Sequence, residues 1–411
     1  VKHYTKINQY KNVETQDLKK AIEETTGQNL DWFFRQWVYE SGYPEYDLKW
    51  SYNQRNRTVQ LKIKQKQDTT KTGLFKMPIE VRIDEHLHTL WVDKKEVIYE
   101  LPVDMRPELV IFNSGMRVPC KLTFNKPINE WILQLEKGPH VLDRIAAINE
   151  LKNKKGRRSV EMALLKAAAS DPFWGVRKEA VQALAKLKPK QYAKELIELS
   201  KGQDNRVRRA IWSALKNYKG DEEVSVFLQE VISTDQKYYS ISDAFRALVV
   251  VDTSAARKRV EALLDTESHN DVIRRSAISY FGSVINDKNY DRLKELVEYG
   301  GITWDARPEA VNQLGKYAKK KPKTLELFVE LLSDRSRDVR TNAVRALGRY
   351  GNKKHFDPLD ELALRDPIIE RFIRAAKKNI MSPPKKSKRS GPEKDLEEVN
   401  KKLNEIKKIL N

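Results

Sequence analysis

The chain has 411 residues, 40% of them apolar and 33% charged, so its length and composition suggest several domains with cores of their own. No run of about 18 apolar residues occurs, which argues against a membrane-spanning helix, and we expect no membrane partner. The net charge is +20, from 78 Lys and Arg against 58 Asp and Glu. The basic residues are spread along the whole chain, which favours a solvated surface and leaves nucleic-acid binding as an alternative.

The first residues and the cysteine content bear on the compartment. Val1-Lys2-His3-Tyr4 has neither an initiator Met nor an apolar stretch, so we expect a fragment that begins inside a helix rather than a signal peptide. Cys120 is the only cysteine, which excludes an internal disulfide and a cysteine-based metal site. A lone cysteine fits a reducing compartment, and the cytoplasm is the compartment we favour.

Residues 1–45 are expected to be helical. Thr15 is a suitable N-cap for a first helix, which Gly27 would end. Asn29 is a suitable cap for a second helix, Leu30–Glu40, which carries Trp32, Phe33, Phe34 and Trp37.

Residues 46–126 alternate between polar and apolar side chains, which is the period of a half-buried strand. Seven short runs separated by turns predict a small antiparallel β-sandwich. The predicted strands cover residues 47–52, 58–64, 78–83, 89–92, 97–101, 109–112 and 121–124.

Residues 140–380 contain an internal repeat, in which an alanine followed by a branched or aromatic residue recurs about every 33 residues. Its alanines are Ala147, Ala180, Ala210, Ala244, Ala277, Ala310 and Ala343, with a weaker eighth copy at Phe372-Ile373. The pattern resembles HEAT repeats, which are pairs of antiparallel helices. A single pair cannot bury its apolar face, so we predict a stacked α-solenoid. The expected fold is therefore multidomain and mostly α, with a helical start, a β-sandwich and then HEAT-like repeats.

The end of the chain has a different composition. Residues 381–393 are rich in Pro, Ser and Lys and predict a basic flexible linker. Residues 394–411 place Leu396, Val399 and Leu403 on one stripe that continues to the end, which predicts a short amphipathic helix. Such a short helix is marginal alone, so we expect it to bind a partner protein or to mediate self-association.

The N-terminal helical segment resembles the end of the catalytic domain of M1-family zinc aminopeptidases. The residues that carry the resemblance are Glu14 to Gly27, Asn29 to Trp37 and Gly42-Tyr43-Pro44, and Pro107 to Asn113 resembles the last strands of that family's β-domain. The resemblance covers residues 1–126, and the repeats agree with larger family members in architecture only. It implies a parent protein that removes N-terminal residues from peptides, with the present chain as its C-terminal part.

The family's zinc motif H-E-x-x-H and its amine-binding motif G-x-M-E-N do not occur in this chain. Two His one helical turn apart bind one metal ion, and the Glu between them activates its water. We therefore expect zinc in the parent protein, no cofactor in this chain, and no catalytic or metal-binding residue among its 411.

Five arginines are the candidate functional residues of the repeats, each three residues before a repeat alanine. They are Arg144, Arg177, Arg274, Arg307 and Arg340. Two interpretations remain open: a ladder of Arg–Asp pairs between repeats, or a surface that binds acidic groups of a partner or nucleic-acid phosphates. Trp174, Trp212 and Trp304 are likewise either packing residues or a peptide platform. His86 and His88 share a strand face, where a polar surface is more typical than a metal site.

The predicted function is a non-catalytic one, in which this region shapes the access of peptides to the parent's active site and supports its catalytic domain. Its partners would be that catalytic domain and the peptide substrates. The alternative is a non-enzymatic HEAT scaffold or an M1-like interaction protein, with a nucleic-acid binder less favoured.

Overall fold

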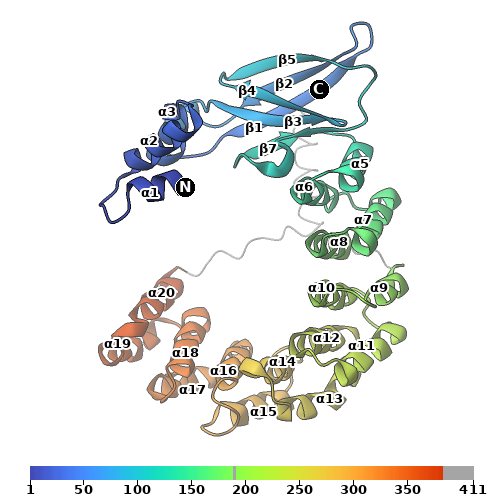
Figure 1. Ribbon diagram of the computed structural model, residues 1–411. Helices are drawn as coiled ribbons and strands as arrows, with labels where there is room; N and C mark the ends of the chain where they lie inside the picture. Colours follow the sequence, from blue (N-terminus) through green and yellow to red (C-terminus); the bar gives the residue numbers. More distant parts are fainter. Residues whose placement is uncertain (188–190, 383–411) are drawn as a thin grey trace, which may run out of the picture. The chain divides into compact units, whose positions relative to one another are not determined.

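The computed structural model describes residues 1–187 and 191–382. All but the first residues of the predicted linker 381–393, and the whole predicted helix 394–411, lie outside these ranges. The chain divides into two compact units between Tyr218 and Lys219, which are described in turn (Figure 1). Within the described ranges, every helix is too short or too polar to cross a bilayer.

The first unit begins with α1 (Lys2–Ile7), α2 (Thr15–Thr26), α3 (Asp31–Phe34) and the π-helix η1 (Arg35–Tyr39). Thr15 is the first residue of α2 rather than its N-cap. The cap is Glu14, which forms a capping box with Asp17. Gly27 ends α2 as predicted, in the left-handed conformation that glycine adopts without strain (φ 68°).

The second predicted helix is shorter than expected and changes its winding. The side chain of Asn29 accepts a hydrogen bond from the amide of Asp31, so the helix starts at Asp31 and not at Leu30. After one α-helical turn the backbone hydrogen bonds change to the π-helical pattern. The amide of Glu40 donates to the carbonyl of Arg35, five residues earlier, at 2.9 Å. The sequence carries no signal for this π-turn.

The β-sandwich has seven strands, as predicted: β1 (Glu45–Asn53), β2 (Thr58–Gln65), β3 (Met77–Ile83), β4 (His86–Val92), β5 (Glu96–Pro102), β6 (Val110–Phe112) and β7 (Lys121–Phe124). They form a four-stranded sheet in the order β5-β2-β1-β7 and a three-stranded sheet in the order β4-β3-β6. The ring of Tyr46 on β1 meets that of Phe112 on β6 edge-on at 5.4 Å, so the two sheets share a core.

One strand pairing differs from the antiparallel expectation. β7 runs parallel to β1, with Tyr46 opposite Leu122. The chain leaves β6 through the short 3₁₀ turn η2 (Ser114–Met116) and crosses to the other sheet, where it enters beside β1 in the same direction. The remaining pairs are antiparallel, and a further short helix, α4 (Thr69–Thr72), lies between β2 and β3.

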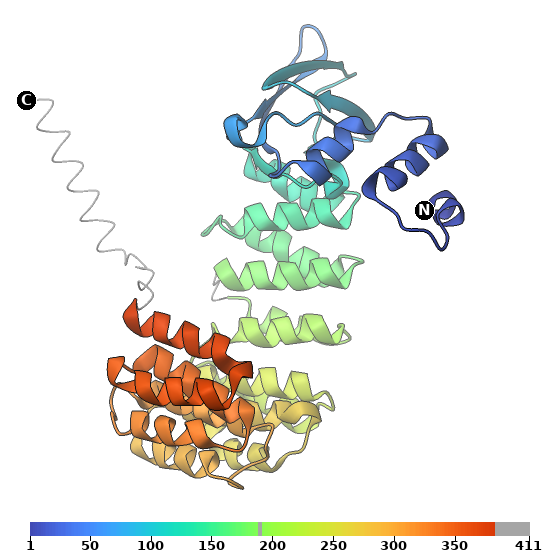
Figure 2. The ribbon, with the colours of Figure 1, turned by 90° about the vertical axis from the view of Figure 1, so that its left-hand side faces the viewer.

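Helical hairpins follow in both units. The first unit contains α5 (Ile128–Lys137), α6 (Val141–Leu151), α7 (Arg158–Ser170), α8 (Trp174–Leu187), α9 (Ala193–Leu199) and α10 (Asn205–Leu215). The second contains α11 (Glu222–Thr234), α12 (Tyr238–Val251), α13 (Thr253–Asp265), α14 (Val272–Phe281), α15 (Asp287–Val297), α16 (Arg307–Leu314), α17 (Thr324–Glu330), α18 (Arg337–Tyr350), α19 (Phe356–Arg365) and α20 (Glu370–Met381). Its 3₁₀ turns are η3 (His269–Asp271), η4 (Gly315–Tyr317), η5 (Leu331–Ser333), η6 (Lys353–His355) and η7 (Pro367–Ile369). Figure 2 shows the helices of each unit stacked in layers.

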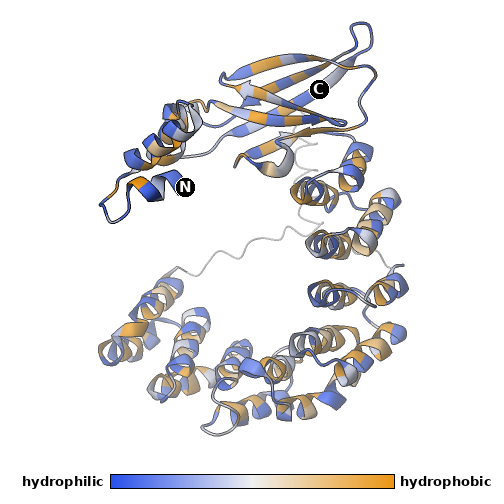
Figure 3. Ribbon diagram, viewed as in Figure 1, coloured by the Kyte–Doolittle hydropathy of each residue, from blue (hydrophilic) through white to orange (hydrophobic). Residues whose placement is uncertain are grey.

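The repeat alanines explain how closely the hairpins stack. All seven lie on the second helix of a hairpin, and all are buried. A methyl side chain lets neighbouring helices approach, and the branched residue that follows each alanine fills the space between them. Apolar residues recur along one side of these helices while the outside remains polar (Figure 3). The fold is thus mostly α-helical, with a small β-sandwich followed by a solenoid of HEAT repeats.

Substitution of Ala277 by Trp tests this packing. Ala277 is fully buried on α14, and a Trp there should wedge the hairpins apart and destabilise the second unit by about 1–3 kcal/mol. Urea unfolding followed by circular dichroism measures the change. Ala375→Trp on the exposed side of α20 is the matched control and should leave the midpoint nearly unchanged. Equal midpoints for both variants would mean that Ala277 does not face a neighbouring helix.

Candidate functional site: the arginine ladder

The five candidate arginines occupy the same place in five hairpins, near the start of the second helix. Arg144 and Arg177 lie on α6 and α8 of the first unit, and Arg274, Arg307 and Arg340 lie on α14, α16 and α18 of the second. The second helices α10 and α12 carry Val207 and Ile241 at this position and have no arginine there.

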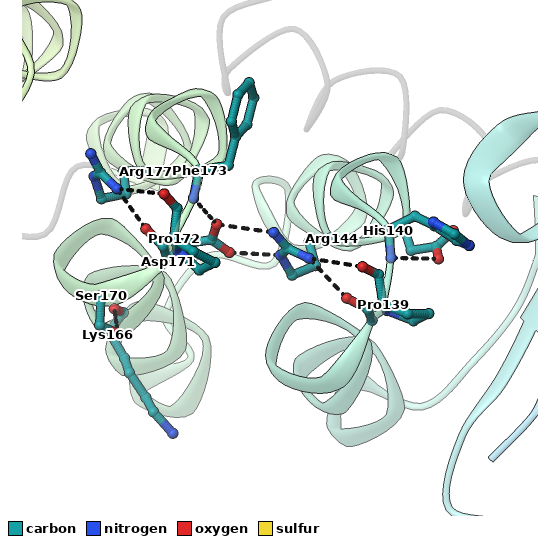
Figure 4. A network of polar contacts seen from close by, with 11 residues as sticks. Pro139, His140, Arg144, Lys166, Ser170, Asp171, Pro172, Phe173 and Arg177 are labelled. Carbon is teal, nitrogen blue, oxygen red and sulfur yellow. Dashed lines mark hydrogen bonds and ion pairs between the residues drawn. The ribbon is translucent and has the colours of Figure 1, made fainter. Parts of the chain in front are cut away.

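Arg144 makes the most complete rung of the ladder (Figure 4). Its Nε and Nη2 donate to the two carboxylate oxygens of Asp171 in the next hairpin, at 2.7 and 3.1 Å. Its Nη1 donates to the carbonyl of Gly138, in the turn between α5 and α6, at 3.0 Å. The side chains of Arg144 and Asp171 are 11% and 5% exposed. One guanidinium therefore ties its own hairpin turn to the following one, inside the protein.

Arg177 continues the ladder with a neutral partner. Its Nη1 donates to the carbonyls of Asp171 and Pro172, and its Nε donates to Oε1 of Gln203 at 2.9 Å. Asp204, beside Gln203, pairs instead with Arg206 at 2.8 Å. The sequence pattern suggested an Arg–Asp rung here, but Gln203 takes the place of the carboxylate.

Two rungs of the second unit repeat the arrangement of Arg144. Arg307 bonds both carboxylate oxygens of Asp334, and its Nε donates to the carbonyl of Val297 at 2.6 Å. Arg340 donates through Nη1 to the carbonyl of Asp334 at 2.7 Å and through Nη2 to Asp366. That hydrogen bond lowers the pKa of Asp366 below its usual value, and the positive charges of Arg340 and Arg337 lower it further.

Arg274 has a partner on its own hairpin. Its Nη1 donates to Asp271, three residues earlier, at 2.8 Å, and its Nε donates to the carbonyl of Leu264. The other carboxylate oxygen of Asp271 accepts from the hydroxyl of Thr303 in the next hairpin. Here the link between repeats passes through Asp271 rather than through the arginine.

Most guanidinium donors of these five arginines are thus engaged inside the protein, with backbone carbonyls and with carboxylate or amide oxygens. Of the two interpretations drawn from the sequence, this geometry favours the structural ladder. An acidic partner could bind the rungs only by displacing buried hydrogen bonds, which is costly.

The first rung also connects to the β-sandwich. Asp143, on α6, accepts from the hydroxyl of Ser114 at 3.0 Å and from the amide of Gly115 at 2.7 Å, both in the turn η2. Nearby, Nζ of Lys126 donates to the carbonyl of Val110 and to Oε1 of Gln134, and burial lowers the pKa of this lysine to about 7. The β-sandwich and the first hairpin therefore share a buried polar joint, which the sequence did not suggest.

The other sequence candidates are dispersed. Trp212 is buried, the ring of Trp174 lies 3.4 Å from the guanidinium of Arg206, and Trp304 is 67% exposed. His86 and His88 line the same surface hollow at the end of the β-sandwich. Burial and the neighbouring His86 lower the pKa of His88. In the part of the chain that the structure describes, no three His, Cys, Asp or Glu side chains gather to hold a metal ion.

Comparison with known protein families identifies the class of the helical repeats. The family of HEAT repeats matches residues 128–216, 161–249 and 303–377. No curated protein matches the chain in sequence.

Among solved structures, the chain is similar to a crystal structure of aminopeptidase A from Legionella pneumophila in complex with aspartic acid, with a TM-score of 0.57 and 13% sequence identity. The match covers 92% of this chain and 53% of that one, so the chain spans about half the length of the aminopeptidase. At this identity the likeness concerns the fold alone.

Substitution of Arg307 by Met tests the ladder. Met fills a similar volume but leaves the Asp334 carboxylate buried without its partner, which should cost the second unit about 3–5 kcal/mol. The exposed Lys378→Met on α20 is the control and should change stability by no more than about 0.5 kcal/mol. Urea melts of both variants give the values. If the Arg307 variant unfolds at the control's midpoint, the rung contributes little to stability.

Substitution of Asp204 by Asn tests a charge pair of the first unit. The hydrogen bonds from the side chain and the backbone of Arg206 lower the pKa of Asp204 to about 2. A lowered pKa stabilises the fold above the unfolded value of about 3.9, and this contribution disappears as the pH falls toward 2. Asn can still cap α10, so wild type should be more stable than Asp204→Asn at about pH 5, with a difference that shrinks below about pH 4. Thermal melts across this range measure it, and a difference independent of pH would contradict the assignment.

Proposed function

We propose that this chain is the C-terminal, non-catalytic part of an M1-family zinc aminopeptidase, in which the β-sandwich and the HEAT repeats support a catalytic domain and shape the access of peptides to it. The parent protein would remove N-terminal residues from peptides. The observation that carries the proposal is the incomplete packing of the N-terminal helical segment.

That segment buries very little of its own apolar surface. In residues 1–43, Ala21 and Phe34 are the buried apolar side chains, while large apolar ones remain exposed. The exposed ones include Ile7, Tyr10, Val13, Phe33, Val38, Tyr39 and Tyr43. Soluble proteins seldom leave so many large apolar residues uncovered in one short segment, and such a surface is typical of a contact with another domain. The end of a catalytic domain, seen without the rest of that domain, would have this character.

The same segment is firmly joined to the β-sandwich. The side-chain amide of Gln36 is buried and bonds the backbone of Lys76 in both directions, and the ring of Trp37 lies 5.6 Å from that of Phe75. Gly42 has a φ of 97°, and a Cβ there would meet Thr72 at 2.5 Å, so the turn into β1 requires glycine. Trp37 and Gly42 belong to the motif on which the family resemblance rests. The structural roles of these two residues therefore support the family resemblance at the level of the fold as well as of the sequence.

The fold comparison supports the proposal in extent as well. The match covers 53% of the similar aminopeptidase, and the rest of that protein leaves room for a separate catalytic region. No set of metal ligands gathers in the described residues of this chain, so we assign none of its side chains to a zinc ion and derive no catalytic step here.

Removal of the repeats from the parent protein tests the proposed role. The parent truncated after residue 126 should keep its zinc and its activity on dipeptides, because neither depends on the repeats. It should lose discrimination between short and long peptides, because the repeats would no longer restrict the space around the active site. The measurement is kcat/KM over a series from dipeptides to dodecapeptides, together with the zinc content.

The present chain serves as the control and should not hydrolyse Ala- or Leu-p-nitroanilide, even with added zinc. An unchanged ratio of long to short substrates would refute the role in access. If the reading frame of the parent protein encodes no H-E-x-x-H motif, the proposal that the parent is a zinc aminopeptidase is refuted. A HEAT scaffold is then the better description.

A further inference from the structure

Charge is unevenly distributed between the two rows of helices that end the second unit. The second-helix row consists of α16 with η4, α18 and α20, and the first-helix row consists of α15, α17 and α19 (Figure 1). The second-helix row has ten Lys and Arg against three Asp and Glu: Arg307, Lys316, Arg337, Arg340, Arg345, Arg349, Arg371, Arg374, Lys377 and Lys378 against Glu309, Asp338 and Glu370. The first-helix row has four basic residues, Lys288, Arg292, Lys294 and Arg365, against eight acidic ones, Asp287, Asp291, Glu295, Glu326, Glu330, Asp357, Asp360 and Glu361.

Half of the cations in the second-helix row have no ion pair within the described residues. Arg307 and Arg340 belong to the ladder, and Arg337, Arg374 and Lys377 pair with carboxylates. The others are Lys316, Arg345, Arg349, Arg371 and Lys378, and all five are exposed. We call these five residues the cationic strip.

Two members of the cationic strip meet at one aromatic ring. The guanidinium carbons of Arg345 on α18 and of Arg371 on α20 each lie 4.7 Å from the centre of the Phe372 ring. The ring holds both cations in place, and among the described residues neither guanidinium has an ion pair, so their hydrogen-bond donors can bind an anion. A carboxylate bound there would relieve the repulsion between two like charges that share one neighbour.

The repeat period places the cationic strip in register. Arg345 and Lys378 are 33 residues apart, and Arg349 lies 33 residues after Lys316, so the members of each pair occupy equivalent positions on successive helices. Asn312 precedes Arg345 by the same interval and is exposed. Axes of packed helices are about 8–10 Å apart, so the charges recur at about that distance across α16, α18 and α20.

We propose that the cationic strip binds an acidic segment of a partner polypeptide, which lies extended across α16, α18 and α20. An extended chain of the polyproline-II type rises about 3.1 Å per residue with three residues per turn, so every third side chain points the same way, about 9 Å from the last. Acidic residues at every third position would therefore meet successive helices. The exposed amide of Asn312 can both donate to and accept from a peptide backbone. This inference does not depend on the proposed peptidase parent.

The surface fits a peptide better than single-stranded nucleic acid. Nucleic-acid strands bind proteins through aromatic rings on which their bases stack, in addition to basic residues. Phe372 is half-buried, and two guanidiniums already lie against its ring. Tyr350, the aromatic side chain of α18, has Arg349 at 6.0 Å from its ring. Charge is thus available on this surface, whereas a free stacking platform is not.

A fluorescein-labelled peptide of repeated Glu-Pro-Ser units tests the proposal with the full chain. Fluorescence anisotropy should show binding that weakens with added salt. The double variant Arg345→Gln/Arg371→Gln should bind at least about tenfold more weakly, since two charged contacts are lost. The matched control, Lys288→Gln/Lys323→Gln, removes the same charge from exposed positions outside the second-helix row and should bind like the wild type. Thermal melts check that both variants stay folded.

Two further probes separate spacing and chemistry from bulk charge. A peptide of the same composition, with its glutamates gathered at one end, should bind more weakly than the regular one. A single-stranded oligothymidylate of equal charge should also bind more weakly. Equal losses in the two double variants, equal binding of the two peptides, or tighter binding of the oligonucleotide would each overturn the proposal.

Discussion

The buried arginine rung is the interaction on which each group of repeats depends. In the rung of Arg144, one guanidinium bonds the carbonyl of Gly138 at the end of α5 and the carboxylate of Asp171 in the following hairpin. The end of a helix carries partial negative charge on its unpaired carbonyls, so an arginine there satisfies both the backbone and the next repeat. Because all three groups are buried, a change in the angle between hairpins would leave a charge or a carbonyl unpaired. Packing of small alanines sets how closely the hairpins approach, and the rung determines their register.

A stack of repeats needs a suitable end, because its outermost unit has no neighbour. In the first unit the β-sandwich supplies that neighbour. Asp143 bonds Ser114 and Gly115, so a turn of the sandwich takes the place that a preceding hairpin would occupy. Lys126 adds a second, partly buried link through Val110 and Gln134. The sandwich is therefore part of the repeat stack in a physical sense, and its stability should be coupled to that of the first hairpin.

The sequence predicted those features that depend on period and failed where single contacts decide. Alternation located the seven strands, and the recurrence of alanine located the second helices of the hairpins. The same period singled out Arg144 and its four counterparts, yet it could not tell a buried rung from an exposed interaction surface, since that depends on which atoms reach Gly138 and Asp171. The π-turn at Arg35, the parallel entry of β7 and the Lys126 joint each arise from tertiary contacts without a local signal. The cationic strip was also missed, because basic residues are scattered in the chain and gather only when helices 33 residues apart lie side by side.

The large positive charge of the chain therefore has two physical meanings. Part of it is internal, as in Arg144 and Arg307, where a buried aspartate neutralises the charge and the pair contributes no net charge. Part of it is external and directional, because the second-helix row of the last repeats is basic while the first-helix row beside it is acidic. A segregated surface of this kind attracts a chain of opposite charge to one side of the helices and repels it from the other. Exposed cations thus recur along the helices with the same period as the buried arginines that stabilise the solenoid. An acidic chain that binds them needs its carboxylates at the same regular spacing.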